Sequence, residues 1–275
     1  MSKRQSVFMA AVVACVLSGP AAAADFDHGW TAFQRGEFTA AIAEWTPLAE
    51  AGHPLAQYNL GVIYDSGLGV GRDVPAALRW WTAAAEKGLA EARHNLALLH
   101  AERADDGIDA DGYVLARQWL QQAADGGFVP SQYTLGKMYA DGVGVEVDAG
   151  RGFALILRAG EAGLVQAQYN LGKMYRDGEG VAADPAEGNR WWRLAAERGY
   201  AKAQDHLAES YARGRGIAQD DVVALAWSMV AARSGHPDSI TRESDLSRKL
   251  EPGQVAAARQ LAEVCLLYTS PSPRD

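Results

Sequence analysis

Residues 164–199 contain the clearest copy of a repeated segment, LVQAQYNLGKMYRDGEGVAADPAEGNRWWRLAAERG. Apolar residues recur every four positions from Ala167 to Tyr175, which places an apolar stripe along one face of a helix. A glycine-rich turn follows. Asp184 and Pro185 are residue types that cap and begin a second helix, and this helix ends at a final glycine. The segment therefore predicts two helices joined by a short turn.

This repeat occurs five times along the chain. Its final glycine recurs from Gly52 to Gly235 at intervals of 36, 39, 36, 36 and 36 residues. Helix pairs with such a period bury their faces against their neighbours, so we predict an all-α fold, an α/α solenoid of helix-turn-helix repeats. The expected repeats are 53–88, 89–127, 128–163, 164–199 and 200–235. The expected structural positions are Leu60, Tyr64, Trp80, Gly88, Leu135, Tyr139, Leu171, Tyr175, Trp191, Gly199, Tyr211 and Trp227.

The repeat resembles a Sel-1-like repeat, which is a branch of the tetratricopeptide superfamily. The resemblance rests on residues 167–181, Asp184, residues 191–192 and residues 195–199, and it recurs over 53–235. It implies a right-handed superhelix with a concave groove that binds extended peptides or helices of partner proteins. Residues 25–52 resemble a related N-terminal helical hairpin of the tetratricopeptide type.

The segment 236–264 predicts a degenerate repeat that ends in a capping helix. Pro252 and Gly253 precede that helix, which begins at Gln254. The residues expected to face inward are Val255, Ala258, Leu261 and Ala262.

The first 24 residues have the pattern of a secretory signal peptide. Lys3 and Arg4 precede an apolar run over 7–17, and four alanines end the segment. The run is too short to span a bilayer, so we expect no stable membrane span after cleavage. We predict an exported protein, periplasmic or secreted. A lipoprotein modified at Cys15 is the minor alternative, because the preceding residues loosely resemble a lipobox.

The last eleven residues, 265–275, resemble a one-frame translation of a transposase adapter used in sequencing libraries. We interpret this tail as a sequencing artefact and leave it out of fold reasoning. The natural C-terminus is then expected to be missing from the sequence.

The composition excludes several classes of function. Lys and Arg number 26 against 34 Asp and Glu, so the chain lacks the basic excess of nucleic-acid-binding proteins, and we expect no nucleic-acid partner. The two cysteines, Cys15 and Cys265, both lie in the terminal segments. The chain between these segments can therefore form neither a disulfide framework nor a zinc site of four cysteines.

Motifs that suggest chemistry are better interpreted as parts of the scaffold. The glycines of 67–71 resemble a phosphate loop, but a helix precedes them and the same glycine pair recurs in four repeats. The acidic insertion 105–112 lacks the bidentate carboxylate of a calcium loop. The six histidines lack the spacing of a zinc hydrolase, and no nucleophile motif is present. We predict no catalytic residue, no metal site and no cofactor.

Tryptophans mark one column of the repeat at helical spacing, which is typical of core residues. Trp81 and Trp192 lie next to this column. We expect these two to be partly exposed.

The face of the first helices opposite the structural positions carries Tyr58 and Val62 in the first repeat. The resemblance implies that this face lines the concave groove. Tyrosine and lysine in adjacent repeats suit an acidic or C-terminal carboxylate segment, whereas Asp205 and Glu209 favour a basic stretch. The expected groove residues are Tyr58, Val62, His94, Leu98, Tyr133, Lys137, Tyr169, Lys173, Asp205 and Glu209.

These patterns lead to three hypotheses about function. The first is a non-catalytic adaptor or regulator in the bacterial periplasm that binds a peptide or helix of an envelope protein. The second is binding or hydrolysis of cell-wall or other small ligands, as suggested by cysteine-rich Sel-1-like proteins, although those relatives staple each helix pair with a disulfide. The third is that the solenoid is the docking half of a longer, truncated protein. The sequence determines neither the partner, nor the envelope pathway, nor the oligomeric state.

Overall fold

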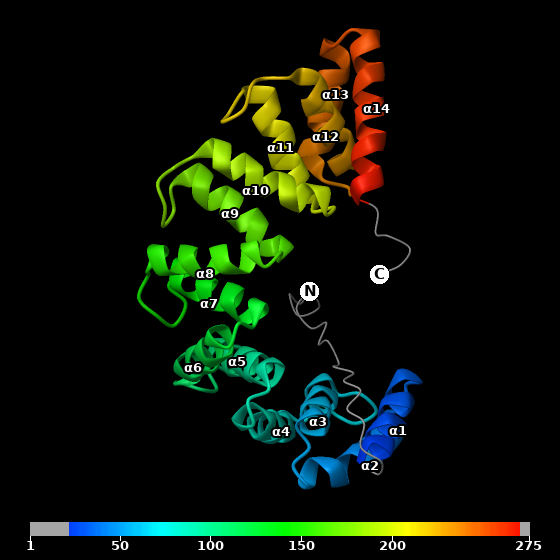
Figure 1. The fold of residues 1–275 in the computed structure, drawn as a ribbon, viewed down its shortest axis with the longest axis vertical. Helices are drawn as coiled ribbons and strands as arrows, with labels where there is room; N and C mark the ends of the chain where they lie inside the picture. The colour runs from blue at the N-terminus through cyan, green and yellow to red at the C-terminus, as the bar shows by residue number, and fades with distance from the viewer. Residues whose placement is uncertain (1–21, 270–275) are drawn as a thin grey trace. The chain divides into compact units, whose positions relative to one another are not determined.

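The computed structural model describes the backbone of residues 22–269 and the side chains of residues 26–264. Within this part of the chain all regular structure is helical, which confirms the all-α prediction (Figure 1). The helices are α1 (Ala22–Gln34), α2 (Phe38–Glu50), α3 (Pro54–Ser66), α4 (Val74–Glu86), α5 (Ala90–Asp105), α6 (Gly112–Asp125), α7 (Val129–Asp141), α8 (Ala149–Glu161), α9 (Val165–Asp177), α10 (Pro185–Glu197), α11 (Ala201–Arg213), α12 (Asp221–Arg233), α13 (Pro237–Lys249) and α14 (Pro252–Thr269).

The chain forms two compact units, an N-terminal unit up to Ser131 and a C-terminal unit from Gln132. In the N-terminal unit, α1 pairs with α2, α3 with α4 and α5 with α6, and successive hairpins pack through α2–α3 and α4–α5. In the C-terminal unit, α9 pairs with α10 and α11 with α12, and α10 packs on α11. Each unit therefore has the stacked helical hairpins of the predicted α/α solenoid.

Glycines and aspartates delimit the helices as the repeat pattern predicts. Gly178 ends α9 with φ of 74°, a left-handed conformation that glycine adopts without steric cost. Asp184 caps α10, where its side chain accepts hydrogen bonds from the backbone N–H groups of Ala186 and Glu187. The same two devices recur in other repeats, with glycine C-caps at Gly67 and Gly214 and aspartate N-caps at Asp73, Asp148 and Asp220.

The predicted structural positions supply much of the core. The leucine column is completely buried, as at Leu60 and Leu171. Trp80, Tyr139 and Trp227 are also buried. The positions that remain partly exposed are Tyr64, Tyr175, Trp191 and Tyr211. The repeat-ending glycines Gly88 and Gly199 have φ of 92° and 81°.

The expectation that Trp81 and Trp192 are partly exposed is wrong. Their exposed fractions are only 1% and 3%. Each indole Nε1–H donates a buried or partly buried hydrogen bond of 3.1 Å to a carbonyl of the first helix, Trp81 to Tyr58 and Trp192 to Tyr169. Each ring lies directly over a glycine of that helix, where a Cβ would collide with it. The glycines under the tryptophans are Gly29 below Trp45, Gly61 below Trp81 and Gly172 below Trp192.

After the fifth repeat, α13 and α14 both pack on α12. Ala258 and Ala262 of α14 are buried against α12 as predicted, but Leu261 is 42% exposed. Leu261 lies beside the narrow face that the two alanines turn toward α12, so the prediction that it faces inward is wrong. The residues of the expected signal peptide lie almost entirely outside the described backbone, which begins at Ala22, and the expected artefact tail extends beyond Thr269.

No helix in the described part of the chain has both the length and the apolar character needed to cross a membrane.

Candidate partner-binding face

One of the expected groove residues in the first helix of each repeat belongs to a set that we call the ladder column. Each side chain of this set makes a polar contact with the residue 37 positions further on, in the next helical hairpin. In the N-terminal unit, Asn95 donates to the Tyr58 hydroxyl at 3.3 Å, and His94 Nδ1 lies 2.9 Å from Ser131 Oγ. The ladder column is Tyr58, His94, Tyr133, Tyr169 and Asp205.

In the N-terminal unit the ladder column is mostly part of the packing between hairpins. Tyr58 and Val62 are only 2% and 3% exposed, so the expectation that they line an open groove is wrong. They pack with the second-helix residue Trp81 and with leucines of the next first helix. Burial raises the pKa of Tyr58 to about 12 and lowers that of His94 to about 4. His94 and Leu98 are partly exposed.

At the far end of the column, Asp205 is buried and already neutralised. Its carboxylate accepts hydrogen bonds from the Arg242 guanidinium at 2.5 Å and from the Ser239 hydroxyl. Burial alone would raise the pKa of Asp205, but these hydrogen bonds and the charge of Arg242 outweigh it and hold the pKa below its ordinary value. Glu209 is likewise paired, with Arg213 at 2.9 Å. Because both carboxylates are already paired with arginines, neither is free to attract the basic segment that the sequence predicted here.

Asp205, His236 and Asp238 place three possible metal-ligand atoms within 4.8 Å of one another. The Arg242 guanidinium donates to the same Asp205 oxygen, Oδ1, that lies nearest His236. A divalent cation here would have to displace this partly buried arginine, so we assign no metal site to these residues.

Between these ends, the C-terminal unit brings aromatic side chains of three repeats together. The Tyr169 ring lies 5.0 Å from the Tyr200 ring and 5.7 Å from the His206 ring, and His206 stacks on Trp192 at 4.5 Å with an interplanar angle of 15°. Asn170 donates to the Tyr133 hydroxyl at 2.8 Å. Tyr133, Tyr169, Tyr200 and His206 are all partly exposed, so the cluster presents polar ring edges at the surface.

The phenols of this cluster are hydrogen-bond donors at neutral pH. Burial raises the pKa of Tyr133, Tyr169 and Tyr200 above the ordinary value of tyrosine, so each hydroxyl keeps its proton. Burial and the nearby charge of Arg176 lower the pKa of His206, which is therefore neutral at pH 7.

The two lysines that the sequence treats alike differ in the structure. Lys137 forms an ion pair with Asp141 one turn further on, at 2.8 Å. Lys173 lies one turn after Tyr169 on α9, and no ion pair to it is found among the described side chains. We call Tyr133, Tyr169, Tyr200 and Lys173 the tyrosine–lysine face. It offers three phenol donors and one lysine that forms no ion pair among the described side chains, although its charge acts on Asp177, whose carboxylate pairs with Arg176.

Tyr200 was missed by the sequence reasoning, although a signal for it exists. It occupies the first position of its repeat, which an aromatic ring also occupies at His53 and Phe128. Each of these rings contacts an aromatic residue of the preceding hairpin, as Phe128 does with His94. An aromatic residue that opens a repeat therefore indicates a ring contact with the preceding hairpin, and at Phe128 and Tyr200 this contact is with the ladder column.

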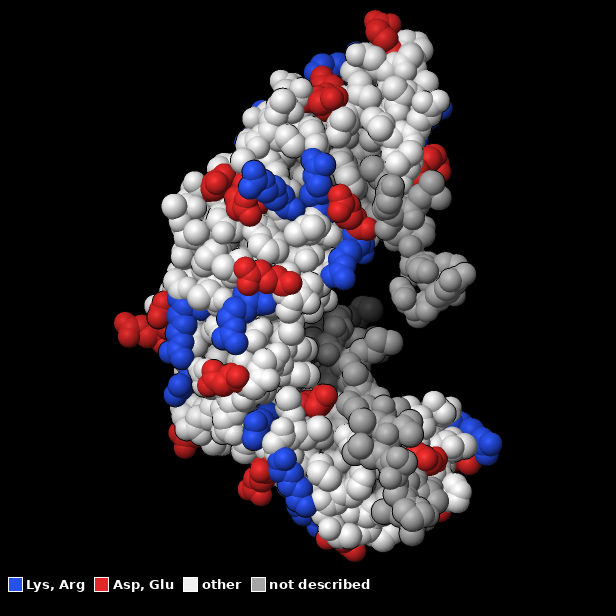
Figure 2. All heavy atoms as spheres, in the orientation of Figure 1, with Lys and Arg blue, Asp and Glu red and all other residues white. Residues whose placement is uncertain are grey.

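Charge is not separated by sign over the surface that Figure 2 shows. Basic and acidic side chains alternate there over both units. This face therefore lacks the broad basic patch that a nucleic-acid partner would need.

The stacked hairpins agree with comparisons to known proteins. A family model described as the Sel1 repeat matches residues 54–89, 90–128, 129–164, 165–200 and 201–236. The chain belongs to the Sel1 repeat family. Each matched segment begins one residue after the corresponding repeat expected from the glycine period. Sel1 repeat solenoids are typically scaffolds for protein–protein interaction and are generally non-catalytic.

Two solved structures share the Sel1 repeat fold with this chain. One is c5321, a protective antigen of uropathogenic Escherichia coli strains, with 29% identity and a TM-score of 0.75 over 85% of this chain and 50% of that protein. The other is a Sel1 repeat protein from Oxalobacter formigenes, with 27% identity and a TM-score of 0.71 over 87% of this chain and 99% of that protein. The chain thus spans about half the length of the Escherichia coli antigen. No curated protein sequence matches significantly.

Proposed function

We propose that this protein is an exported, non-catalytic scaffold of the bacterial periplasm that binds an acidic segment of an envelope protein on its tyrosine–lysine face. The observation that carries the proposal is Lys173, a partly exposed cation with no ion pair among the described side chains, beside a half-buried cluster of protonated tyrosines. Membership of the Sel1 repeat family supports protein binding as the general role.

The chemistry of this face matches a carboxylate. Phenol hydroxyls donate hydrogen bonds to anionic oxygens, and a lysine supplies a compact positive charge. Tyrosine rings add contact area while losing little conformational entropy, because each has only two side-chain torsions. A segment with an acidic side chain or a free C-terminal carboxylate can use all three features.

The other parts of the expected groove offer less. Tyr58 and Val62 are buried in the N-terminal unit, and Asp205 and Glu209 are paired with arginines. The proposal therefore places recognition in the third and fourth repeats and at Tyr200, the first residue of the fifth. Export to the periplasm is supported by the pattern of residues 1–24, with a charged start, an apolar run and an alanine-rich end.

The test is a pull-down from bacterial envelope extract with three forms of the purified protein: wild type, Lys173→Glu and Lys137→Glu. Both substitutions reverse one charge at the same position of adjacent repeats, but only Lys173 lacks an ion pair. We expect one partner to be retained by wild type and by the Lys137 variant and lost from the Lys173 variant, because an ion-supported hydrogen bond contributes about 1.5–3 kcal/mol. All three proteins should melt at the same temperature.

Equal retention by all three forms would move the binding site away from the tyrosine–lysine face. Equal loss from both variants would show that net charge, rather than the free lysine, controls binding.

A further inference from the structure

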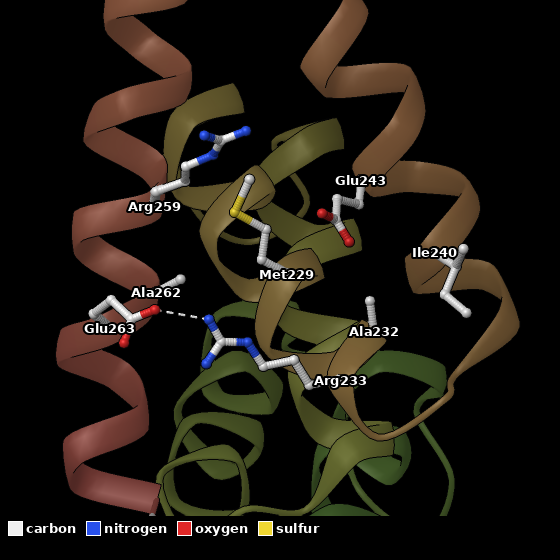
Figure 3. A pocket seen from close by; sticks show the side chains of 8 residues that line it. All are labelled: Met229, Ala232, Arg233, Ile240, Glu243, Arg259, Ala262 and Glu263. Atoms are coloured by element: carbon white, nitrogen blue, oxygen red, sulfur yellow. Dashed lines mark hydrogen bonds and ion pairs between the residues drawn. The ribbon is translucent and has the colours of Figure 1, made fainter.

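A second surface of the C-terminal unit has the features of a helix-binding slot. It lies between α13 and α14, which both pack on α12 but are separated from each other where α12 forms the floor (Figure 3). The slot has a volume of about 440 Å3, which is enough for a few side chains of a docked segment. Its lining residues are Met229, Ala232, Arg233, Ile240, Glu243, Arg259, Ala262 and Glu263.

The floor of the slot is apolar, and each wall adds an apolar side chain to its charged ones. Met229 and Ala232 of α12 form the floor, and Ala262 of α14 lies beside them. Ile240 projects from α13 and is 51% exposed. A large aliphatic side chain this exposed, next to a recess with an apolar floor, favours burial by a partner.

The two walls carry opposite charges. Glu243 stands on α13 and Arg259 on α14, and neither forms an ion pair with another described side chain. By contrast, Arg233 and Glu263, also at the slot, form an ion pair at 2.7 Å. One acidic wall and one basic wall remain available for an occupant with both kinds of charge.

The floor of the slot belongs to α12, the helix on which α13 and α14 both pack. Within the C-terminal unit, α11 packs on α10, and α13 then packs on α11 and α12. Each step places one new helix on the surface of the preceding hairpin. α14 follows α13 in the chain and also packs on α12, and the slot is the part of the α12 surface left between these two helices. A helix is therefore the shape of occupant that this kind of surface accepts.

We propose that the slot binds an amphipathic helix of a partner protein, with apolar side chains on the α12 floor, a basic flank against Glu243 and an acidic flank against Arg259. This interaction is independent of the tyrosine–lysine face and involves other helices.

The experiment measures fluorescence anisotropy with three labelled synthetic helical peptides of 18 residues. All share one leucine stripe, and their flanks carry lysine and glutamate, lysine only, or glutamate only. Wild type should bind the mixed peptide about tenfold more tightly than either other peptide, because only that peptide satisfies both walls. A bound helix can run in either direction along the slot, and reversing it exchanges its two flanks. The mixed peptide therefore matches both walls in one of the two directions, and the comparison among the three peptides depends only on the signs of their charges.

Wall variants then provide matched controls at exposed sites. Arg259→Glu makes both walls acidic and should shift the preference to the lysine-only peptide. Glu243→Arg makes both walls basic and should shift it to the glutamate-only peptide. Ile240→Glu should weaken all three peptides at least tenfold while the circular dichroism spectrum stays unchanged.

Absence of saturable binding by every peptide would overturn the proposal. So would preferences that ignore the wall variants, since binding would then be non-specific. Sedimentation that detects a dimer of wild type, dispersed by Ile240→Glu, would make a second copy of this chain the occupant and would also overturn it.

Discussion

The contact between Gly172 and Trp192 allows a test of how the two helices of a repeat recognise each other. A Cβ atom added to Gly172 would lie 2.2 Å from Cδ1 and Nε1 of the indole. In the second repeat the same two positions are Ala97 and Leu120. The smaller leucine leaves room for the alanine Cβ, so the two positions should be energetically coupled.

The magnitudes follow from packing and helix propensity. In wild type, Gly172→Ala should cost about 1 kcal/mol net, because overpacking costs roughly 1–3 kcal/mol and alanine gains about 1 kcal/mol over glycine in a helix. Trp192→Leu should cost about 3 kcal/mol through the cavity and the lost hydrogen bond to Tyr169. Once leucine is present the clash disappears, and Gly172→Ala should stabilise the protein by about 1 kcal/mol.

The assay is a double-mutant cycle in thermal and urea unfolding, followed by circular dichroism. For a protein of this size, Gly172→Ala should lower Tm by about 3 °C in wild type and raise it by a similar amount in the Trp192→Leu background. Repeat proteins can unfold in parts, so hydrogen exchange in α9 and α10 should report the same change of sign.

Gly150→Ala in α8 is the control for propensity alone. Its added Cβ would meet only Asp148, at 3.7 Å, so alanine should stabilise α8 in either background. The reasoning is refuted if Gly172→Ala has the same effect, within about 0.5 kcal/mol, with tryptophan and with leucine at 192.

Three further predictions concern the ladder column and the fold. Asp205→Ala should reduce the free energy of unfolding by roughly 2–3 kcal/mol, because Arg242 would remain partly buried without its counter-charge; a loss below about 0.5 kcal/mol in urea unfolding would show that the pair is dispensable. His94 has a pKa of about 4 in the folded protein against 6.5 for the ordinary group, so the unfolded chain takes up the proton first. Stability should therefore fall by up to roughly 3 kcal/mol as the pH drops from about 6.5 to 4, and His94→Gln should flatten this window; parallel profiles would contradict it. The far-UV circular dichroism spectrum should be dominantly helical, and a strong β signature would exclude the repeat assignment.

Much of the fold was predictable because it is local and repeated. Gly178 and Asp184 act within one turn of their own helix, so their residue types identify the end of one helix and the start of the next. The period places the leucine column in the core without knowledge of any neighbour. Repetition strengthens the prediction, because a pattern that recurs in five copies is not a coincidence.

The candidate site was less predictable, because it depends on which of several neighbouring charges form a pair and on contacts with other repeats. Lys137 and Lys173 occupy equivalent positions, yet only Lys137 has an acidic residue one turn further on with which it pairs; in the next repeat Asp177 pairs with Arg176 instead. The sequence predicts that Asp205 is an exposed acidic residue, whereas in the structure it is paired with Arg242, 37 residues further on. The sequence predicts that Leu261 faces inward because it is apolar. Since apolar residues occur on several faces of this helix, the sequence does not show which face contacts α12.

By itself, the sequence determined the helical hairpins and the leucine and glycine columns, since these depend mainly on interactions within about one turn of helix. Only the tertiary structure decided which polar side chains are neutralised and which tryptophans are covered. Burial and pairing depend on how closely side chains of different helices approach each other. A single residue type can set this approach: Gly172 lets the Trp192 ring lie against its helix, where any Cβ would collide with the ring. The ion pair of Asp205 with Arg242 and the slot beside Ile240 are consequences of that packing.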